Sequence, residues 1–136
     1  MKKLLTVVLL SSTMLLSATE ENNYEVINAF AVLKYENITG VTQVERKGDN
    51  WFVRYGNDNT TLIPVNTGSH TSTLTYMPRH KVAVEDLIRR SLKEEKGTVA
   101  KVEYVDRKVV IKITDGPDDL FFTYDSNGNL VGRDIF

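Results

Sequence analysis

The sequence contains no cysteine. Disulfides and thiolate metal sites are therefore excluded, and so is lipid attachment, which requires a cysteine directly after a signal cleavage site. Without any of these supports, burial of apolar side chains has to stabilise the fold. The chain is long enough to form such a core in one domain.

Residues that commonly carry catalysis are also scarce. Only two histidines are present, His70 and His80, and neither has an acidic residue at the spacing of a metal site. Ser69 precedes His70, but adjacent residues rarely orient a base onto a nucleophile, and no third member of a triad is apparent. We therefore expect no enzymatic activity, no catalytic residues, no cofactor and no zinc site.

The chain also lacks an excess of positive charge. It has 17 Lys and Arg against 18 Asp and Glu, which gives a formal net charge of −1. A nucleic-acid partner would normally require a basic face. The charge balance therefore argues against binding to DNA or RNA.

The N-terminus does contain a strong signal. Lys2 and Lys3 precede a run of apolar and hydroxyl residues over Leu4–Leu16, which is shorter than the roughly 20 residues of a spanning helix. This pattern predicts a secretory signal peptide over residues 1–18, with cleavage after Ala18 or a position or two away. An uncleaved anchor is the alternative. We expect residues 19–136 to be periplasmic or secreted, as a single domain without stable membrane insertion.

The remaining sequence alternates between helical and extended patterns. Apolar residues at three-to-four spacing predict helices over Asn22–Thr39 and His80–Lys96. Gly40 and Gly97 are well placed to end these helices. Turn residues separate period-two segments that predict eight strands, at Val41–Arg46, Trp51–Tyr55, Thr60–Val65, Ser72–Tyr76, Val99–Tyr104, Lys108–Thr114, Leu120–Tyr124 and Leu130–Phe136.

The order of one helix and four strands thus occurs twice, and a constant offset relates the two halves. It maps Val26 onto Val84, Phe30 onto Ile88 and Val53 onto Ile111, among others. We interpret this as an internal duplication, with repeat one over about 22–77 and repeat two over about 78–136.

The second half carries a family resemblance. A strand ending Val-Glu-Tyr, a strand Lys-Val-Val-Ile-Lys-Ile and the stretch Asp119–Val131 resemble the closing part of PepSY-like domains. Two such units behind a signal peptide are similar to the beta-lactamase-inhibitor-like, PepSY-like periplasmic proteins. The resemblance implies an α+β fold in which two helix-plus-antiparallel-meander repeats form one curved antiparallel sheet. Both helices would pack on one face and leave the other open to a protein or peptide.

Strand alternation assigns side chains to these two faces. The predicted core face contains Trp51, Val53, Tyr55, Val109, Ile111, Ile113, Leu120, Phe122 and Tyr124. The predicted partner-binding face contains Phe52, Arg54, Ile63, Val110, Lys112 and Phe121. Aromatic and arginine side chains are enriched at interfaces, although an ordinary half-solvated sheet face has the same composition.

The combined reading is an exported, non-catalytic protein-binding module that inhibits or modulates an envelope or secreted protein. A periplasmic module that binds a small ligand or a peptide is the alternative. The acidic loop from Asp115 to Asp119 and the run beginning at Asp125 leave two possibilities open, a cation site and a tight turn.

Export gives the first testable prediction. Protein isolated from its native host should lack the leader and begin near Thr19, because the apolar run ends there in a polar continuation. Intact-mass spectrometry of the purified protein measures this directly. A mature species that retains Met1, or one found only in the cytoplasm, would contradict the prediction.

Overall fold

The computed structural model describes residues 25–66 and 73–136. The predicted signal peptide and its cleavage site lie outside these residues, and so do Ser69 and His70.

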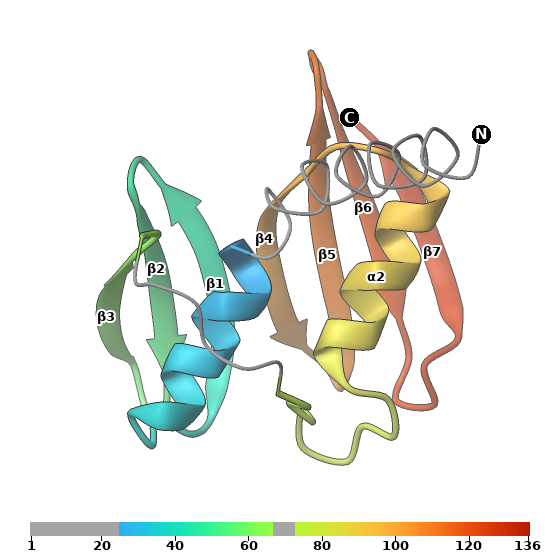
Figure 1. Ribbon diagram of the computed structural model, residues 1–136. Coiled ribbons are helices and arrows are strands. Elements are labelled where there is room, and N and C mark those ends of the chain that lie inside the picture. Colours follow the sequence, from blue (N-terminus) through green and yellow to red (C-terminus); the bar gives the residue numbers. More distant parts are fainter. Residues whose placement is uncertain (1–24, 67–72) are drawn as a thin grey trace, which may run out of the picture.

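Seven strands form one antiparallel sheet in the described part of the chain (Figure 1). Their order across the sheet is β3-β2-β1-β4-β5-β6-β7, so that each pair of neighbours except β1 and β4 is joined by a short connection along the chain. The strands are β1 (Val41–Lys47), β2 (Asn50–Tyr55), β3 (Asn59–Pro64), β4 (Thr98–Val105), β5 (Lys108–Asp115), β6 (Asp118–Tyr124) and β7 (Leu130–Ile135).

Two helices of the described chain lie on the same face of this sheet. The first covers residues 25–35 and lies in front of β1 and β4, and α2 (Val84–Glu94) lies in front of β5 and β6 (Figure 1). The first helix stops earlier than predicted because Asn37 takes a left-handed conformation with φ of 57°. The Asn37 and Ile38 N–H groups then donate to the carbonyls of Lys34 and Leu33, which closes a Schellman motif ahead of Gly40.

The second helix is also shorter than predicted at both ends. Residues before Val84 bond elsewhere, since the His80 N–H donates to the Met77 carbonyl and the Lys81 N–H to the Ser126 carbonyl. At the other end, Gly97 does not cap the helix. A Cβ at Gly97 would lie 2.6 Å from both the Ile113 Cγ2 and the Thr114 carbonyl oxygen, so glycine is needed for the close approach of β5.

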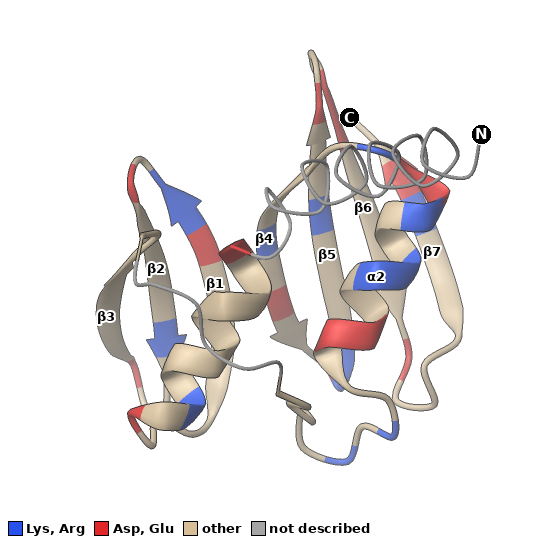
Figure 2. Cartoon of the chain, in the orientation of Figure 1, with Lys and Arg blue, Asp and Glu red and all other residues tan. Residues whose placement is uncertain are grey.

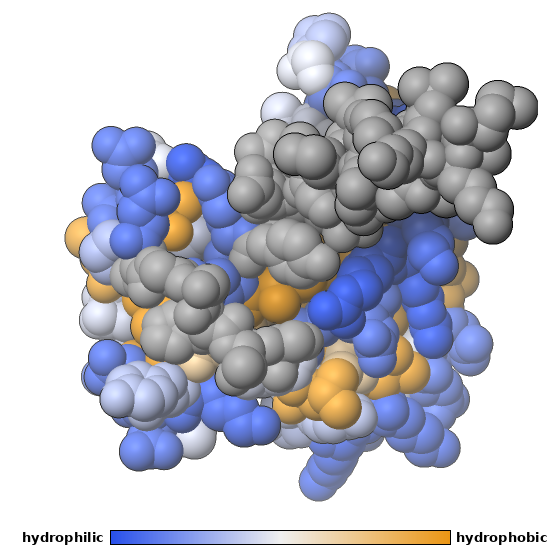
Figure 3. Space-filling model, in the orientation of Figure 1, coloured by the Kyte–Doolittle hydropathy of each residue, from blue (hydrophilic) through white to orange (hydrophobic). Residues whose placement is uncertain are grey.

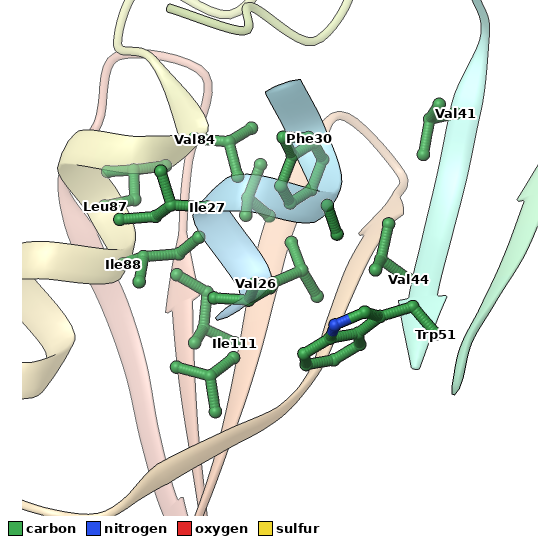
Figure 4. Packing of buried hydrophobic residues seen from close by; sticks show 14 of the residues in the cluster. Val26, Ile27, Phe30, Val41, Val44, Trp51, Val84, Leu87, Ile88 and Ile111 are labelled. Carbon is green, nitrogen blue, oxygen red and sulfur yellow. The ribbon is translucent and has the colours of Figure 1, made fainter. Parts of the chain in front are cut away.

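The core lies between the helices and the sheet (Figure 4). Phe30 and Ile88 come from the two helices, and Trp51 and Ile111 come from strands on either side of the sheet centre; all four are at most 1% exposed. The predicted core face is confirmed for eight of its members, which are buried, whereas Tyr55 is only partly buried against the core.

The predicted fold class is wrong in its central point. The architecture is one seven-stranded sheet and not two helix-plus-meander repeats, because residues before α2 supply three strands and residues after it supply four. The expected strand at Ser72–Tyr76 is absent over its described residues, 73–76. There the Thr75 N–H donates to the Glu85 carboxylate and the Thr75 carbonyl accepts from Val84, so its backbone groups bond to α2 instead of to a strand.

The face assignment can be tested by truncation. Ile111→Ala should lower the free energy of unfolding by roughly 2–5 kcal/mol, because Ile111 is fully buried under the helices and the change leaves a cavity. Its neighbour Val110 points to the opposite face, and Val110→Ala should cost less than about 1 kcal/mol. Urea denaturation of both variants measures the difference. Equal losses would contradict the assignment.

Candidate functional site

The described helices leave the opposite face of the sheet uncovered. We call it the open face. Direct cross-strand pairing defines its side chains, since residues opposite each other in an antiparallel ladder share a face. One complete row crosses all seven strands and contains Leu62, Phe52, Glu45, Lys101, Lys112, Phe121 and Asp134. The next row contains Thr60, Arg54, Gln43, Glu103, Val110, Thr123 and Gly132.

Five of the six predicted binding residues lie in these two rows: Phe52, Arg54, Val110, Lys112 and Phe121. The structure brings them onto one surface. Ile63 does not belong there, since it pairs with Trp51 and is 5% exposed in the core.

Leu62 takes the place that was predicted for Ile63. The turn after β2 sets Tyr55 opposite Asn59, which puts Phe52 opposite Leu62, and Leu62 is 59% exposed. The length of that turn was the available signal in the sequence, because loop length fixes the register of a hairpin.

Phe52 lies between two cationic side chains. The Lys47 Nζ is 4.6 Å from the centroid of its ring, and the Arg54 Cζ is 5.3 Å away. Cations at this distance are attracted to the aromatic ring by about 0.5–1 kcal/mol at exposed sites. The arrangement holds an aromatic surface in a fixed position beside Leu62 of the adjoining strand.

Phe121 forms a second aromatic position on the other half of the open face. The Lys112 Nζ is 5.8 Å from its ring centroid, and the Phe136 ring packs against it edge-on at 5.4 Å. Four inter-strand steps separate Phe52 from Phe121, which corresponds to roughly 19 Å at the usual strand spacing. The open face thus offers two separated aromatic contacts.

Charged residues of both signs fill the space between these aromatic positions. The ion pairs are long, at 3.8 Å for Lys112–Asp119, 3.9 Å for Lys101–Glu103 and 4.0 Å for Lys47–Glu45. Such partly exposed pairs contribute at most about 1 kcal/mol each. Lys101 and Lys112 lie directly opposite each other, an arrangement that is unfavourable for like charges. Figure 2 shows residues of both charges on β1 and on β4.

A groove on the helix-bearing side is a second candidate site. It has a volume of about 380 Å³ and lies between the end of the first helix and residues 74–78. Its lining is mainly apolar and includes Phe30, Leu33, Ile38 and Met77, together with the half-exposed Leu74 and Tyr76. Figure 3 shows apolar surface exposed among hydrophilic residues on this side.

Glu85 is a fully buried carboxylate in the first turn of α2. Its oxygens accept hydrogen bonds from the Thr75 N–H at 2.8 Å, the Thr75 hydroxyl at 2.7 Å and the Thr73 hydroxyl at 3.3 Å. These three donors belong to the segment that precedes the helix. The carboxylate therefore attaches that segment to α2, a role that no pattern in the sequence indicated.

The hydroxyl groups of Ser91 and Tyr124 also have a structural role, because they bond to each other inside the fold. The Ser91 hydroxyl donates to the Leu87 carbonyl, so the buried Tyr124 hydroxyl donates to Ser91 at 2.8 Å. Burial raises the pKa of Tyr124 above its ordinary value, and the hydrogen bond with Ser91 partly offsets the increase. Tyr124 is therefore a neutral phenol in a satisfied network and not a base.

Asp125 closes the turn between β6 and β7. Its Oδ1 accepts from the N–H groups of Asn129 and Asn127 at 2.9 and 3.0 Å, and these bonds, that of Asn129 first, hold the pKa of the carboxyl below its usual value. This geometry favours the tight turn at Asp125. In the described part of the chain, no group of three or more His, Cys, Asp or Glu side chains could hold a metal ion.

His80 is 6% exposed, and its Nδ1 lies 3.2 Å from the Val82 carbonyl oxygen. Its buried Nε2 makes no hydrogen bond with the described residues.

No helix within residues 25–66 and 73–136 has the length and hydropathy needed to cross a membrane.

Comparison with known proteins adds no relative. No family model matches the chain, and no curated protein or solved structure matches it either. The resemblance to PepSY-like proteins, the export signal, the location and the lack of enzymatic activity therefore stay predictions.

The role of Glu85 is testable with its neighbour as control. Glu85→Ala should lower the free energy of unfolding by roughly 1–3 kcal/mol, because it leaves the partly buried donors of Thr75 without their acceptor. Asp86→Ala should cost less than about 1 kcal/mol, since Asp86 is half-exposed and pairs only with Arg89 at the surface. Thermal and urea unfolding compare the two. A mild effect of the Glu85 change would show that its hydrogen bonds do not anchor the segment.

Proposed function

We propose that this chain is an exported, non-catalytic module that binds an envelope or secreted protein through its open face and so inhibits or modulates it. One observation carries the proposal. In the described chain, helices cover one face of the seven-stranded sheet, and the other face presents Phe52 and Phe121 about 19 Å apart among charged side chains of both signs.

The chemistry of the open face indicates what a partner should supply. Lys101 and Lys112 oppose each other at its centre, between the two aromatic positions. Glu103 and Asp119 lie near these lysines, so the centre of the open face carries charges of both signs. The partner surface that fits therefore has apolar side chains that cover Phe52 and Phe121 and charges of both signs between them.

The mixture of aromatic and charged side chains on the open face also fits a reversible interface with a solvated polar rim. Aromatic and arginine side chains supply most of the energy of typical interfaces, whereas partly exposed ion pairs mainly set orientation. Phe52, Phe121 and Arg54 are thus the expected energetic contacts, and the lysines are expected to affect the association rate and its dependence on salt.

The apolar groove supports a second candidate function, binding of a small ligand or short peptide. Its volume of about 380 Å³ is within the size range of ligand pockets, and its lining is mainly apolar. Titration of isotope-labelled protein with long-chain alcohols and fatty acids, followed by NMR, distinguishes the two candidates. Shifts confined to Leu33, Ile38 and Tyr76 would favour the groove.

Alanine substitution on the open face tests the first candidate. A pull-down of envelope proteins with the mature chain supplies the partner, and calorimetry then gives the dissociation constant. Phe52→Ala and Phe121→Ala should each weaken binding by about thirtyfold or more, or about 2 kcal/mol, if they are hot-spot residues. Their unfolding free energies should change much less than that of Ile111→Ala.

Tyr35→Ala is the matched control for these variants. Tyr35 is a 75% exposed aromatic residue at the end of the first helix, which lies on the other side of the sheet from the open face. Its substitution should leave the dissociation constant within about twofold. Normal binding by well-folded Phe52 and Phe121 variants would sink the proposal and move the interface to the helices or loops.

A further inference from the structure

We propose that the outer edge of β7 accepts an extended segment of another protein, which adds a strand to the sheet by backbone hydrogen bonds. β7 is the last strand in the sheet order, with β6 on one side, and no described element lies on its other side (Figure 1). This edge is separate from the open face, and the inference does not depend on the function proposed for that face.

The hydrogen-bond pattern shows which backbone groups of β7 are available. Asp119 and Phe136 exchange both of their backbone hydrogen bonds, at 3.0 and 2.8 Å. Along an antiparallel ladder, hydrogen-bonded pairs alternate with non-hydrogen-bonded pairs. The pair of Asp134 with Phe121 is two residues from the Phe136 pair, so the backbone groups of Asp134 also bond to β6. The N–H and C=O groups of the intervening Arg133 and Ile135 therefore point outward and can bond to an added strand.

The side chains at this edge are apolar to an unusual degree. Leu130, Val131, Ile135 and Phe136 are 46%, 54%, 64% and 78% exposed, so four large exposed hydrophobic residues lie within the last seven positions. A long hydrophobic edge strand is a surface that proteins normally protect. A proline protects the opposite edge of the sheet, since β3 ends at Pro64, which has no N–H to donate.

Pairing between two copies of β7 is disfavoured by charge and by a bulge. In a symmetric antiparallel pair, one register places Arg133 opposite the same residue of the second copy, and the next places Asp134 opposite its own counterpart. Both set like charges directly across from each other. A register centred on Gly132 needs regular pairing at Val131, where the shift between Thr123 and Tyr124 interrupts the ladder. A register centred on Ile135 sets the charged Asp134 opposite the apolar Phe136 of the second copy. The occupant that fits is therefore a segment of a different protein.

The charges also indicate the sequence of that segment. Arg133 lies on the helix-bearing face and is 3.6 Å from Glu95, so its charge is already paired. Asp134 lies on the open face, and within the described chain no ion pair involves it. A basic side chain opposite Asp134 and an apolar side chain opposite Ile135 would complement this edge. The partner is thus an extended, alternating apolar segment that carries a basic residue.

Amide exchange in the full-length protein tests the site with a defined probe. The probe is a short synthetic peptide of alternating valine and threonine with one central lysine. At saturation it should slow exchange of the Arg133 and Ile135 N–H groups by about tenfold or more, and leave the amides of β3 unchanged. A peptide with glutamate in place of lysine should bind at least about threefold more weakly.

A proline substitution removes only the outward donor. Ile135→Pro should keep the melting temperature within a few degrees, because no bond to β6 is lost, and should weaken peptide binding by about tenfold. Ile135→Val retains the N–H group and should bind within about threefold of the parent. Absence of peptide binding, equal binding by the proline variant, or protection that appears on β3 or the open face would overturn the proposal. So would a stable dimer of the parent that Ile135→Pro dissociates, because the occupant would then be a second copy.

Discussion

The pairing of β1 with β4 holds the structure together, because among the described strands it is the one contact that joins residues before α2 to residues after it. Val44 lies opposite Val102 in this pairing, and both are buried at the centre of the sheet. The first helix covers this junction and α2 lies beside it, so their apolar residues form one core (Figure 4). Without the pairing, each half would expose an edge strand and part of that core.

Burial on one side of a continuous sheet determines what the other side can do. Along β2, Trp51 and Val53 are enclosed while Phe52 faces away, so the same short segment serves the core and the open face. A shift of register by one residue would exchange these roles. The position of the candidate contact residues therefore depends on core packing, which makes the surface rigid. Its two aromatic positions are held at a spacing set by the strands between them.

Strand locations could be predicted from the sequence because period-two alternation and turn residues are local signals. The boundaries of seven strands agree within about two residues, and alternation assigned Phe52 and Ile111 to the correct faces. The predictions that were wrong have different causes. The register of β3 moved Ile63 into the core. The buried Glu85 drew Thr75 away from a strand, which removed the fourth strand of predicted repeat one and so the equivalence of the two repeats. Both helices are shorter than predicted, because a local turn at Asn37 ends the first helix and the residues before Val84 make other backbone hydrogen bonds.

Native-state hydrogen exchange of the β1 and β4 amides tests most directly whether this junction unites the fold. If it does, the amides between Val44 and Val102 should exchange only through global unfolding, with the same free energy as the most protected amides of β2 and β5. Addition of denaturant should lower all of these values together. Exchange of the β1 to β3 amides at a lower free energy than those of β4 to β6 would contradict the account, because the two parts would then open independently.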